Sequence, residues 1–445
     1  MKSQRGFLTP KAGNGLLSLR LRASPLIVRN AVTDLKKDIS VISGTALMLN
    51  IVIGAGALVL PGLAFKLVGD AAIYSWVACA VIAIPLLLVF VIMGQRYPDA
   101  GGVSHFVQRA FGNRAYVMAS LIFLGAVLFG LPSIALTGGH YLASYIEAPP
   151  SMLGLVLMTV ATVINFLPTS AATKVTTVIA SGILLILISA VVIGLYGLDL
   201  ANLGGKFAAP LNVRPATLFM PFMMLFFAFT GWEVAAGISE EFKRPEIDFP
   251  RAMFCSFLIV CTLYFIMAFV VQANPTASSH ETAFVSIVEN RLGQFGGVII
   301  SISAALIILA NLTAAIWAVS RMVFSLGREG VLPIKLQVRD SGSPVSSIII
   351  TASALSFAVL LNWSGLIELE KMLALSGQNF LILYGAAAVA LVRLTFSAKE
   401  KLVAFVALLV VAIMLVVSGQ TLIYPGALAL LGWFVAGHRS LQQGT

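Results

Sequence analysis

Residues 41–65 read VISGTALMLNIVIGAGALVLPGLAF, and residues 216–238 read ATLFMPFMMLFFAFTGWEVAAGI. Each stretch is apolar and long enough to cross a bilayer as a helix, which takes about 20 residues. Each also has glycine near its middle, at Gly54 and Gly56 in the first and at Gly231 in the second. Two apolar spans that are interrupted at matching places indicate a binding site at the middle of a membrane.

The rest of the chain is apolar as well. Of its 445 residues 59% are hydrophobic and 10% are charged, whereas soluble domains carry about 25% charged residues. A chain with so little charge needs lipid as its solvent, and helices satisfy all of their own backbone groups there. We therefore predict an all-α integral membrane protein with twelve transmembrane helices over 41–65, 72–94, 115–140, 152–168, 174–196, 216–238, 251–273, 296–320, 346–362, 370–392, 400–417 and 420–437.

The basic residues predict the orientation. Lys and Arg number 28, and in a twelve-span arrangement almost all of them fall on the side that holds both termini. Basic loops face the cytoplasm, so we expect cytoplasmic N- and C-termini and a location in the cell (inner) membrane. The net charge of +10 is then an orientation signal, and we predict no nucleic-acid partner. The five basic residues that fall on the opposite side of the membrane in this arrangement are Lys66, Lys206, Arg214, Arg291 and Lys371.

Two regions differ in composition. Residues 1–40 form a basic stretch, which we interpret as a cytoplasmic N-terminal tail; an organelle transit peptide, a lipid-surface segment and an upstream start codon are alternatives. Residues 41–438 form the transporter domain, with short loops and no extramembrane catalytic domain. If spans 1–5 and 6–10 are two halves, the two interruptions occupy equivalent places.

An interrupted helix has a chemistry of its own. The break leaves N–H groups unpaired at one helix end and C=O groups unpaired at the other. The N–H end suits a carboxylate and the C=O end suits an ammonium group, so a zwitterionic amino acid matches both. Glycine lets a ligand approach the backbone directly.

Glu233 is the one acid of 18 Asp and Glu that falls well inside a predicted span. An ionisable group at such depth is costly and marks a functional site by default. We interpret Glu233 as the proton-coupling residue. The alternative is a structural carboxylate that accepts hydrogen bonds from its own loosened helix.

Three motifs point to a family. They are Gly54–Pro61 (GAGALVLP), Tyr97–Phe106 (YPDAGGVSHF) and the stretch from Gly231-Trp232-Glu233 to Ala252. With these three motifs in this order, the chain resembles the amino acid–polyamine–organocation transporter superfamily. Within it, the chain is particularly similar to the bacterial exporters of L-methionine and branched-chain amino acids. Ala55 departs from the pattern, since many members have a small hydroxyl residue there.

The resemblance implies an inverted repeat of five plus five helices, over about 41–196 and 216–392, followed by two extra helices over about 400–437. It also implies that the substrate carboxylate binds the first interruption and that the amino group lies near the carbonyls of the second. Phe229 and Trp232 would cover the substrate. The implied substrate-binding residues are Ile53, Gly54, Ala55, Gly56, Phe229, Thr230, Gly231 and Trp232.

Further polar residues have two interpretations each. Asn311, near the middle of span 8, lines the pocket or joins helices through its amide. The charged loop after span 6 is a solvated positive-inside loop or an intracellular gate, in which its charges pair with Arg96 or Arg109 in one state. The gate residues would be Arg96, Glu240, Glu241, Lys243 and Arg244. We predict no metal and no cofactor, because the cysteines lie apart in apolar spans.

These features predict a secondary transporter of neutral apolar amino acids (Met, Leu, Ile or Val) that works by alternating access with protons. No second buried acid would neutralise a cationic substrate, and no buried base would hold a second carboxylate. Export rests on the resemblance alone. Uptake or exchange of other amino acids or polyamines, and a non-transporting amino-acid sensor, are alternatives. An intramembrane enzyme is disfavoured, because the four histidines lie at span ends or in loops. We expect an apolar pocket lining of Ile53, Leu58, Met223, Phe226, Phe229 and Trp232.

Overall fold

A computed structural model of the chain describes residues 39–54, 56–98, 102–166, 185–196, 215–274, 279–328, 345–417 and 422–442, with the isolated positions 198, 331 and 332. Across these residues the regular structure is helical, and extended backbone pairs only at an isolated bridge between Ile39 and Phe242. The predicted all-α class is confirmed for this part of the chain. Nearly all of the predicted tail lies outside the described residues.

The helices follow the apolar segments. Seven helices within the described ranges are long and apolar enough to cross a membrane, and shorter apolar helices include Leu185–Leu195. The labelled elements are α1 (Val41–Val52), α2 (Gly56–Val68), η1 (Gly69–Ala71), α3 (Ala72–Arg96), α4 (Gly102–Phe111), α5 (Asn113–Ala143), α6 (Pro150–Ile164), α8 (Pro215–Phe219), α9 (Phe222–Ala228), α10 (Trp232–Ala235), η4 (Ala236–Glu241), α11 (Pro245–Ala273), α12 (Ala283–Arg328), α13 (Val345–Trp363), α14 (Leu369–Leu394), α15 (Ala398–Val417) and α16 (Ile423–Gln442).

The first predicted span is broken into α1 and α2. The start of α1 is fixed by a capping box, in which Ser40 and Ser43 each bond the backbone of the other and satisfy free N–H groups. The helix ends at Val52 because Ile53 has an extended backbone, with φ −78° and ψ 97°. A new helix starts at Gly56. The glycine interruption predicted from the sequence is therefore a real break.

The second interruption lies between α9 and α10. Here Gly231 has φ 109°, a conformation that residues with a side chain rarely adopt. The break spans residues 229–231, and it separates α9 from α10 as the first break separates α1 from α2.

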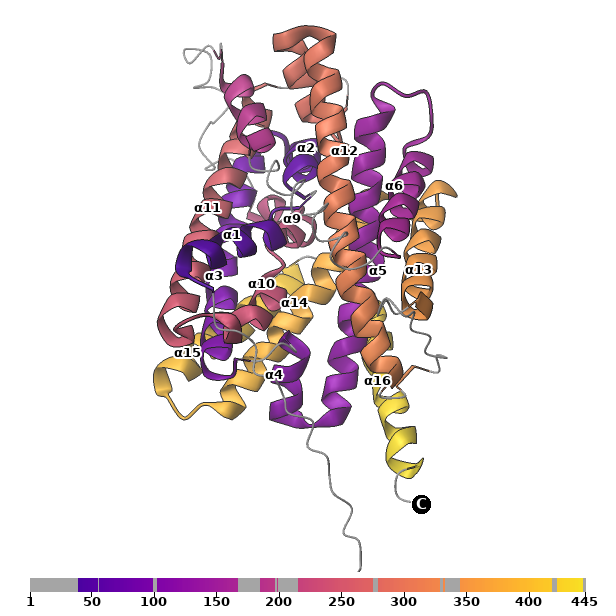
Figure 1. The fold of residues 1–445 in the computed structure, drawn as a ribbon. Helices are drawn as coiled ribbons and strands as arrows, with labels where there is room; N and C mark the ends of the chain where they lie inside the picture. Colours follow the sequence, from indigo (N-terminus) through magenta and orange to yellow (C-terminus); the bar gives the residue numbers. More distant parts are fainter. Residues whose placement is uncertain are drawn as a thin grey trace, which may run out of the picture. The chain divides into compact units, whose positions relative to one another are not determined.

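The packing brings the breaks together with three long helices. The half-helices α2 and α9 are in contact, and α1 packs on α10 and α11. Next to them, α5 contacts α6, α12, α14 and α16 along its length (Figure 1). Because α14 also contacts α9 and α12 contacts α2, the long helices α5, α12 and α14 surround the breaks.

Some boundaries differ from the prediction. The predicted span 296–320 is the middle of a much longer α12, whose helix continues into polar ends that hydropathy does not count. Near its start α12 bends at Gly293, which has φ 71°. Of the predicted span 174–196, only the part from residue 185 is described.

Candidate functional site

The two breaks lie against each other. A carbon atom added to Gly56 would lie 3.5 Å from Cβ of Ala228. One added to Gly231 would lie 3.4 Å from Cα of Val52. A side-chain carbon at either glycine would thus already contact the other interrupted span, so the two breaks lie close together.

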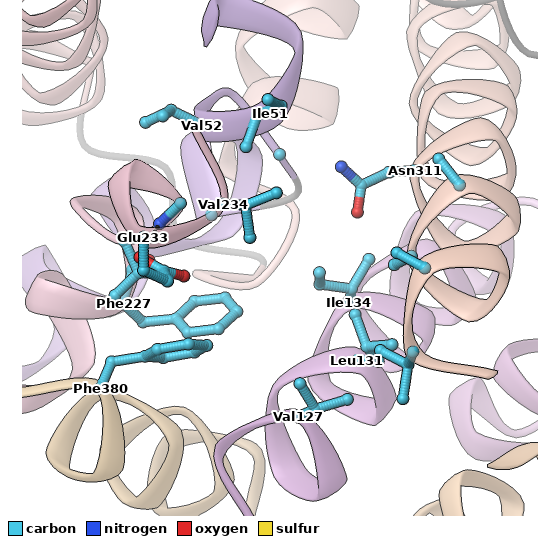
Figure 2. A pocket seen from close by; sticks show the side chains of 18 of the residues that line it. Ile51, Val52, Val127, Leu131, Ile134, Phe227, Glu233, Val234, Asn311 and Phe380 are labelled. Carbon is cyan, nitrogen blue, oxygen red and sulfur yellow. Dashed lines mark hydrogen bonds between the residues drawn. The ribbon is translucent and has the colours of Figure 1, made fainter. Parts of the chain in front are cut away.

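A cavity of about 350 Å³ opens beside the breaks. Three residues of α5 at helical spacing, Val127, Leu131 and Ile134, form one wall of it (Figure 2). The rings of Phe227 and Phe380 lie at another side, with their centroids 6.5 Å apart. The full lining is Leu47, Ile51, Val52, Gly54, Gly56, Phe123, Val127, Leu131, Ile134, Phe227, Ala228, Thr230, Gly231, Glu233, Val234, Asn311, Ala314, Ala315, Ala318, Val319 and Phe380.

Glu233 is the one charged residue in this lining. Its Oε2 atom accepts hydrogen bonds from the backbone N–H of Gly231, at 2.9 Å, and from the Tyr384 hydroxyl, at 2.6 Å. The Tyr384 ring is held by edge contacts with Phe90 and Phe226. The carboxyl is thus fixed at the start of α10 by its own break and by α14.

Asn311 faces the cavity from α12, on the opposite side from Glu233 (Figure 2). A carbon atom added to Gly54 would lie 3.4 Å from Nδ2 of Asn311, so the amide lies beside the first break. Asn311 lines the cavity, as one of its two predicted interpretations expects. An amide in this position can donate to a ligand carboxylate or accept from a ligand amine.

The predicted binding residues divide into two groups. Gly54, Gly56, Thr230, Gly231 and Asn311 line the cavity, whereas Ala55 lies outside the described residues. The other three predicted residues are buried away from it. Phe229 packs edge-on against Tyr264, Trp232 packs against Phe257, and Ile53 is 1% exposed.

The cavity lining is apolar, as expected, but the apolar residues that form it differ from the six named from the sequence. None of the six apolar residues expected from the sequence borders the cavity, because they point into the protein core. Those that do border it come mainly from α1, α5 and α12, and α9 adds Phe227 and α14 adds Phe380. The spacing of Val127, Leu131 and Ile134 shows that they share a helix face, but sequence alone does not say which face of α5 points inward.

The predicted gate charges pair differently in this conformation. Arg96 bonds Glu400 at 2.5 Å and Thr395 at 3.2 Å. Arg244 pairs with Asp248 one turn along its own helix, at 3.0 Å, and this carboxylate raises the pKa of the guanidinium. The backbone of the loop bonds the start of α1, since Ile39 N donates to Glu241 O and Lys243 N donates to Ile39 O. Nothing is described of the Glu240 side chain.

An ion-pair cluster at the far end of α2 was not predicted. Lys66 bonds Glu281 at 3.1 Å and Glu370 at 2.8 Å. Burial opposes ionisation of Glu281, but its own backbone N–H, the Ser279 hydroxyl and Lys66 together lower the pKa of this carboxyl. The cluster ties α2 to α14 and to the residues before α12.

Groups of three or more His, Cys, Asp and Glu side chains that could hold a metal ion were not found in the described part of the chain.

Apolar helices around a cavity that lies beside two interrupted spans form the architecture of a membrane transport protein. Residues 39–438 match the amino acid permease family, and the chain belongs to that family. The resemblance inferred from the three motifs is thereby confirmed.

Named relatives agree with the family. The chain is 28% identical over 421 residues to an uncharacterized amino acid permease, YecA, of Bacillus subtilis, covering 90% of this chain and 96% of that one. It is 32% identical over 236 residues to the L-methionine/branched-chain amino acid exporter YjeH of Escherichia coli, covering 52% of this chain and 56% of YjeH. It is also 24% identical to the serine/threonine exchanger SteT of Bacillus subtilis, over 67% of this chain and 70% of SteT.

Proposed function

We propose that this permease is a secondary carrier of neutral, mainly apolar amino acids such as methionine, leucine, isoleucine and valine. The cavity lining carries the proposal: it is apolar and aromatic, with Glu233 as the one charged group among the lining residues of the described chain. A cationic side chain would need a further acid, and an acidic side chain would need a base. A neutral side chain needs neither.

The backbone of the two breaks would bind the common part of the amino acid. The first break, at Ile53, Gly54, Ala55 and Gly56, starts a helix whose free N–H groups suit the carboxylate. The second break, at Phe229, Thr230 and Gly231, ends a helix whose free carbonyls suit the ammonium group. Asn311 would add a side-chain hydrogen bond beside Gly54. Phe229 and Trp232 would cover the substrate only after a rearrangement, since both are buried here.

Glu233 would couple transport to protons. Both of its donors bond Oε2, so a proton can be added at Oε1 without breaking either bond. Because Glu233 also borders the cavity, a change in its charge acts directly on a bound ammonium group and on the break at Gly231.

The proposed architecture is an inverted repeat of five helices over about 41–196 and 216–392, with two extra helices over about 400–437, twelve spans in total. Both termini would be cytoplasmic, in the inner membrane, behind the basic tail 1–40. Alternating access would rock the repeats about the breaks. The charges of Arg96, Glu240, Glu241, Lys243 and Arg244 would exchange partners in that motion.

Efflux is the proposed direction, supported by the similarity to an exporter over half of the chain. The similarity to an exchanger supports exchange as the second candidate. A sensor with the same fold would bind amino acids without moving them.

Proteoliposomes preloaded with labelled leucine, methionine, arginine or putrescine test these proposals together. We expect leucine and methionine to leave the vesicles, faster when a proton gradient is directed inward. Release of arginine or putrescine instead would contradict the substrate class. Binding of leucine without any release would favour the sensor.

A further inference from the structure

Tyr264 lies behind both breaks. It belongs to α11, is fully buried and does not line the cavity. Its hydroxyl oxygen lies 3.3 Å from the carbonyl oxygen of Val52 and 3.1 Å from that of Ala228. Val52 is the last residue of α1 and Ala228 is the last residue of α9. One hydroxyl group therefore reaches the ends of both half-helices.

The breaks deprive these two carbonyls of their helical hydrogen-bond partners. In an uninterrupted helix each carbonyl accepts from the N–H group four residues later. The partners would be Gly56 for Val52 and Trp232 for Ala228, and these residues begin the next helices, α2 and α10, beyond the breaks. Tyr264 has a single O–H to donate, and that hydrogen lies within reach of both carbonyls, which can share it.

The junction needs such a donor. The C-terminal end of a helix carries partial negative charge, and here two such ends meet in the protein interior. A buried carbonyl without a donor is costly. The Tyr264 ring is held in place by Trp76, with centroids 5.3 Å apart, and by Phe229, with centroids 5.6 Å apart at 90°. Its hydroxyl group thus has little freedom to leave the two carbonyls.

We propose that Tyr264 is a positioning residue for substrate binding, which ties the two interruptions to each other and sets the spacing of the backbone groups that hold the amino acid. The inference rests on the proposed function for the identity of the ligand. It also gives Phe229 a role that differs from the predicted one, since this ring supports Tyr264 in the present conformation.

A matched pair of variants tests the proposal. Tyr264→Phe removes the hydroxyl from the junction. Tyr141→Phe is the control, because the Tyr141 hydroxyl is equally buried and donates to Leu58 O at 3.1 Å, a carbonyl inside α2 and not at the end of a half-helix. Amide hydrogen exchange of the full chain in detergent would be followed in residues 49–56 and 226–233, together with the dissociation constant of leucine.

We expect Tyr264→Phe to speed exchange in both segments and to weaken leucine binding by about twofold to tenfold, the range that the loss of one hydrogen bond brings. Tyr141→Phe should change neither quantity. Faster exchange in only one segment, or equal effects of the two variants, would overturn the proposal. If the wild-type protein binds no leucine, the proposed substrate fails, while the exchange data still test the tie between the breaks.

A second experiment applies if Tyr264→Phe does not fold. Replacement of Tyr264 by 3-fluorotyrosine keeps the ring and the hydroxyl, and fluorine NMR then reports on the junction. Saturating leucine should shift the resonance at position 264 and leave that of 3-fluorotyrosine at position 141 in place. A signal at position 264 that ignores bound leucine would contradict the proposal.

Discussion

At the residue scale, Glu233 is both buried and in contact with the cavity. It is 3% exposed and yet borders the cavity, and its two donors come from its own break and from α14. A carboxyl in this position can change charge at the proposed substrate site, and both hydrogen bonds to Oε2 leave Oε1 open to a proton.

Glu233→Gln should remove the dependence of leucine transport on the proton gradient while leucine binding remains. Glutamine keeps an oxygen that accepts from Gly231 and Tyr384, so we expect the free energy of unfolding to fall by only about 1–2 kcal/mol. Glu147→Gln is the control, since Glu147 is exposed in the loop between α5 and α6. The measurement is leucine efflux with and without the proton gradient. A Glu233→Gln variant whose efflux still responds to the gradient would exclude Glu233 as the proton site.

Ala315→Leu should narrow the cavity. Ala315 borders it one helical turn after Asn311, so added methylene groups take the space of the substrate side chain. We expect weaker binding of leucine and methionine by about tenfold to 200-fold, with less effect on alanine, which serves as the internal control. Competition binding across this series is the measurement, and an equal loss for all three would show that position 315 does not contact the side chain.

Sequence singles out residues where polarity is rare: Glu233 and Asn311 stand out in apolar spans, and both border the cavity. The apolar lining is harder to read from sequence. Phe226 and Phe227 are alike there, and only the direction of α9 places the second one at the cavity. Tyr264 gave no signal at all, since its importance depends on two carbonyls that are 212 and 36 residues away along the chain.

At the scale of elements, the two helix breaks determine where the candidate site lies. Both could be predicted from their glycines, and each separates two helices in the structure. Their mutual contact could not be predicted, because Gly56 against Ala228 and Gly231 against Val52 are tertiary contacts. Helix ends were likewise less predictable, as the long α12 shows.

Gly231→Ala tests whether the second break needs its left-handed residue. Alanine is strained at φ 109°, so we expect a loss of stability of about 1–3 kcal/mol and weaker leucine binding. Gly426→Ala is the matched control, because Gly426 lies in α16 with open space around it and alanine should stabilise a helix there by about 0.5–1 kcal/mol. Thermal unfolding with and without leucine compares the two. A stable Gly231→Ala variant that binds leucine normally would show that the break tolerates ordinary backbone.

At the scale of the whole molecule, the cavity and the Lys66 cluster lie on different sides of the breaks. The cavity is lined by α1, which precedes the first break, whereas Lys66 follows it by ten residues, or about 15 Å of helix. Glu281 and Glu370 lie 215 and 304 residues from Lys66 along the chain, so sequence reasoning could assign Lys66 to a side of the membrane but could not find its partners.

Lys66→Met should loosen the end of the molecule that the cluster ties together. Glu281 and Glu370 would then lose the ammonium group that bridges them, and their repulsion favours separation of α2 from α14. We expect a cysteine in the cavity to become more reactive toward an impermeant reagent added from that end. Lys371→Met is the control, as Lys371 neighbours Glu370 but takes no part in the cluster. Equal reactivity in both variants would mean that the cluster does not restrict access.

The most direct test of the central claim, that an apolar amino acid binds in the cavity beside the two breaks, is substrate protection of a single cysteine. Ala315→Cys would be made after the three natural cysteines, Cys79, Cys255 and Cys261, are replaced by alanine, with Glu147→Cys as an exposed control. Leucine and methionine should slow thiol modification at position 315 in a saturable way, arginine and glutamate should not, and position 147 should be indifferent to all four. Unchanged modification at position 315, at leucine concentrations that saturate binding, would contradict the claim.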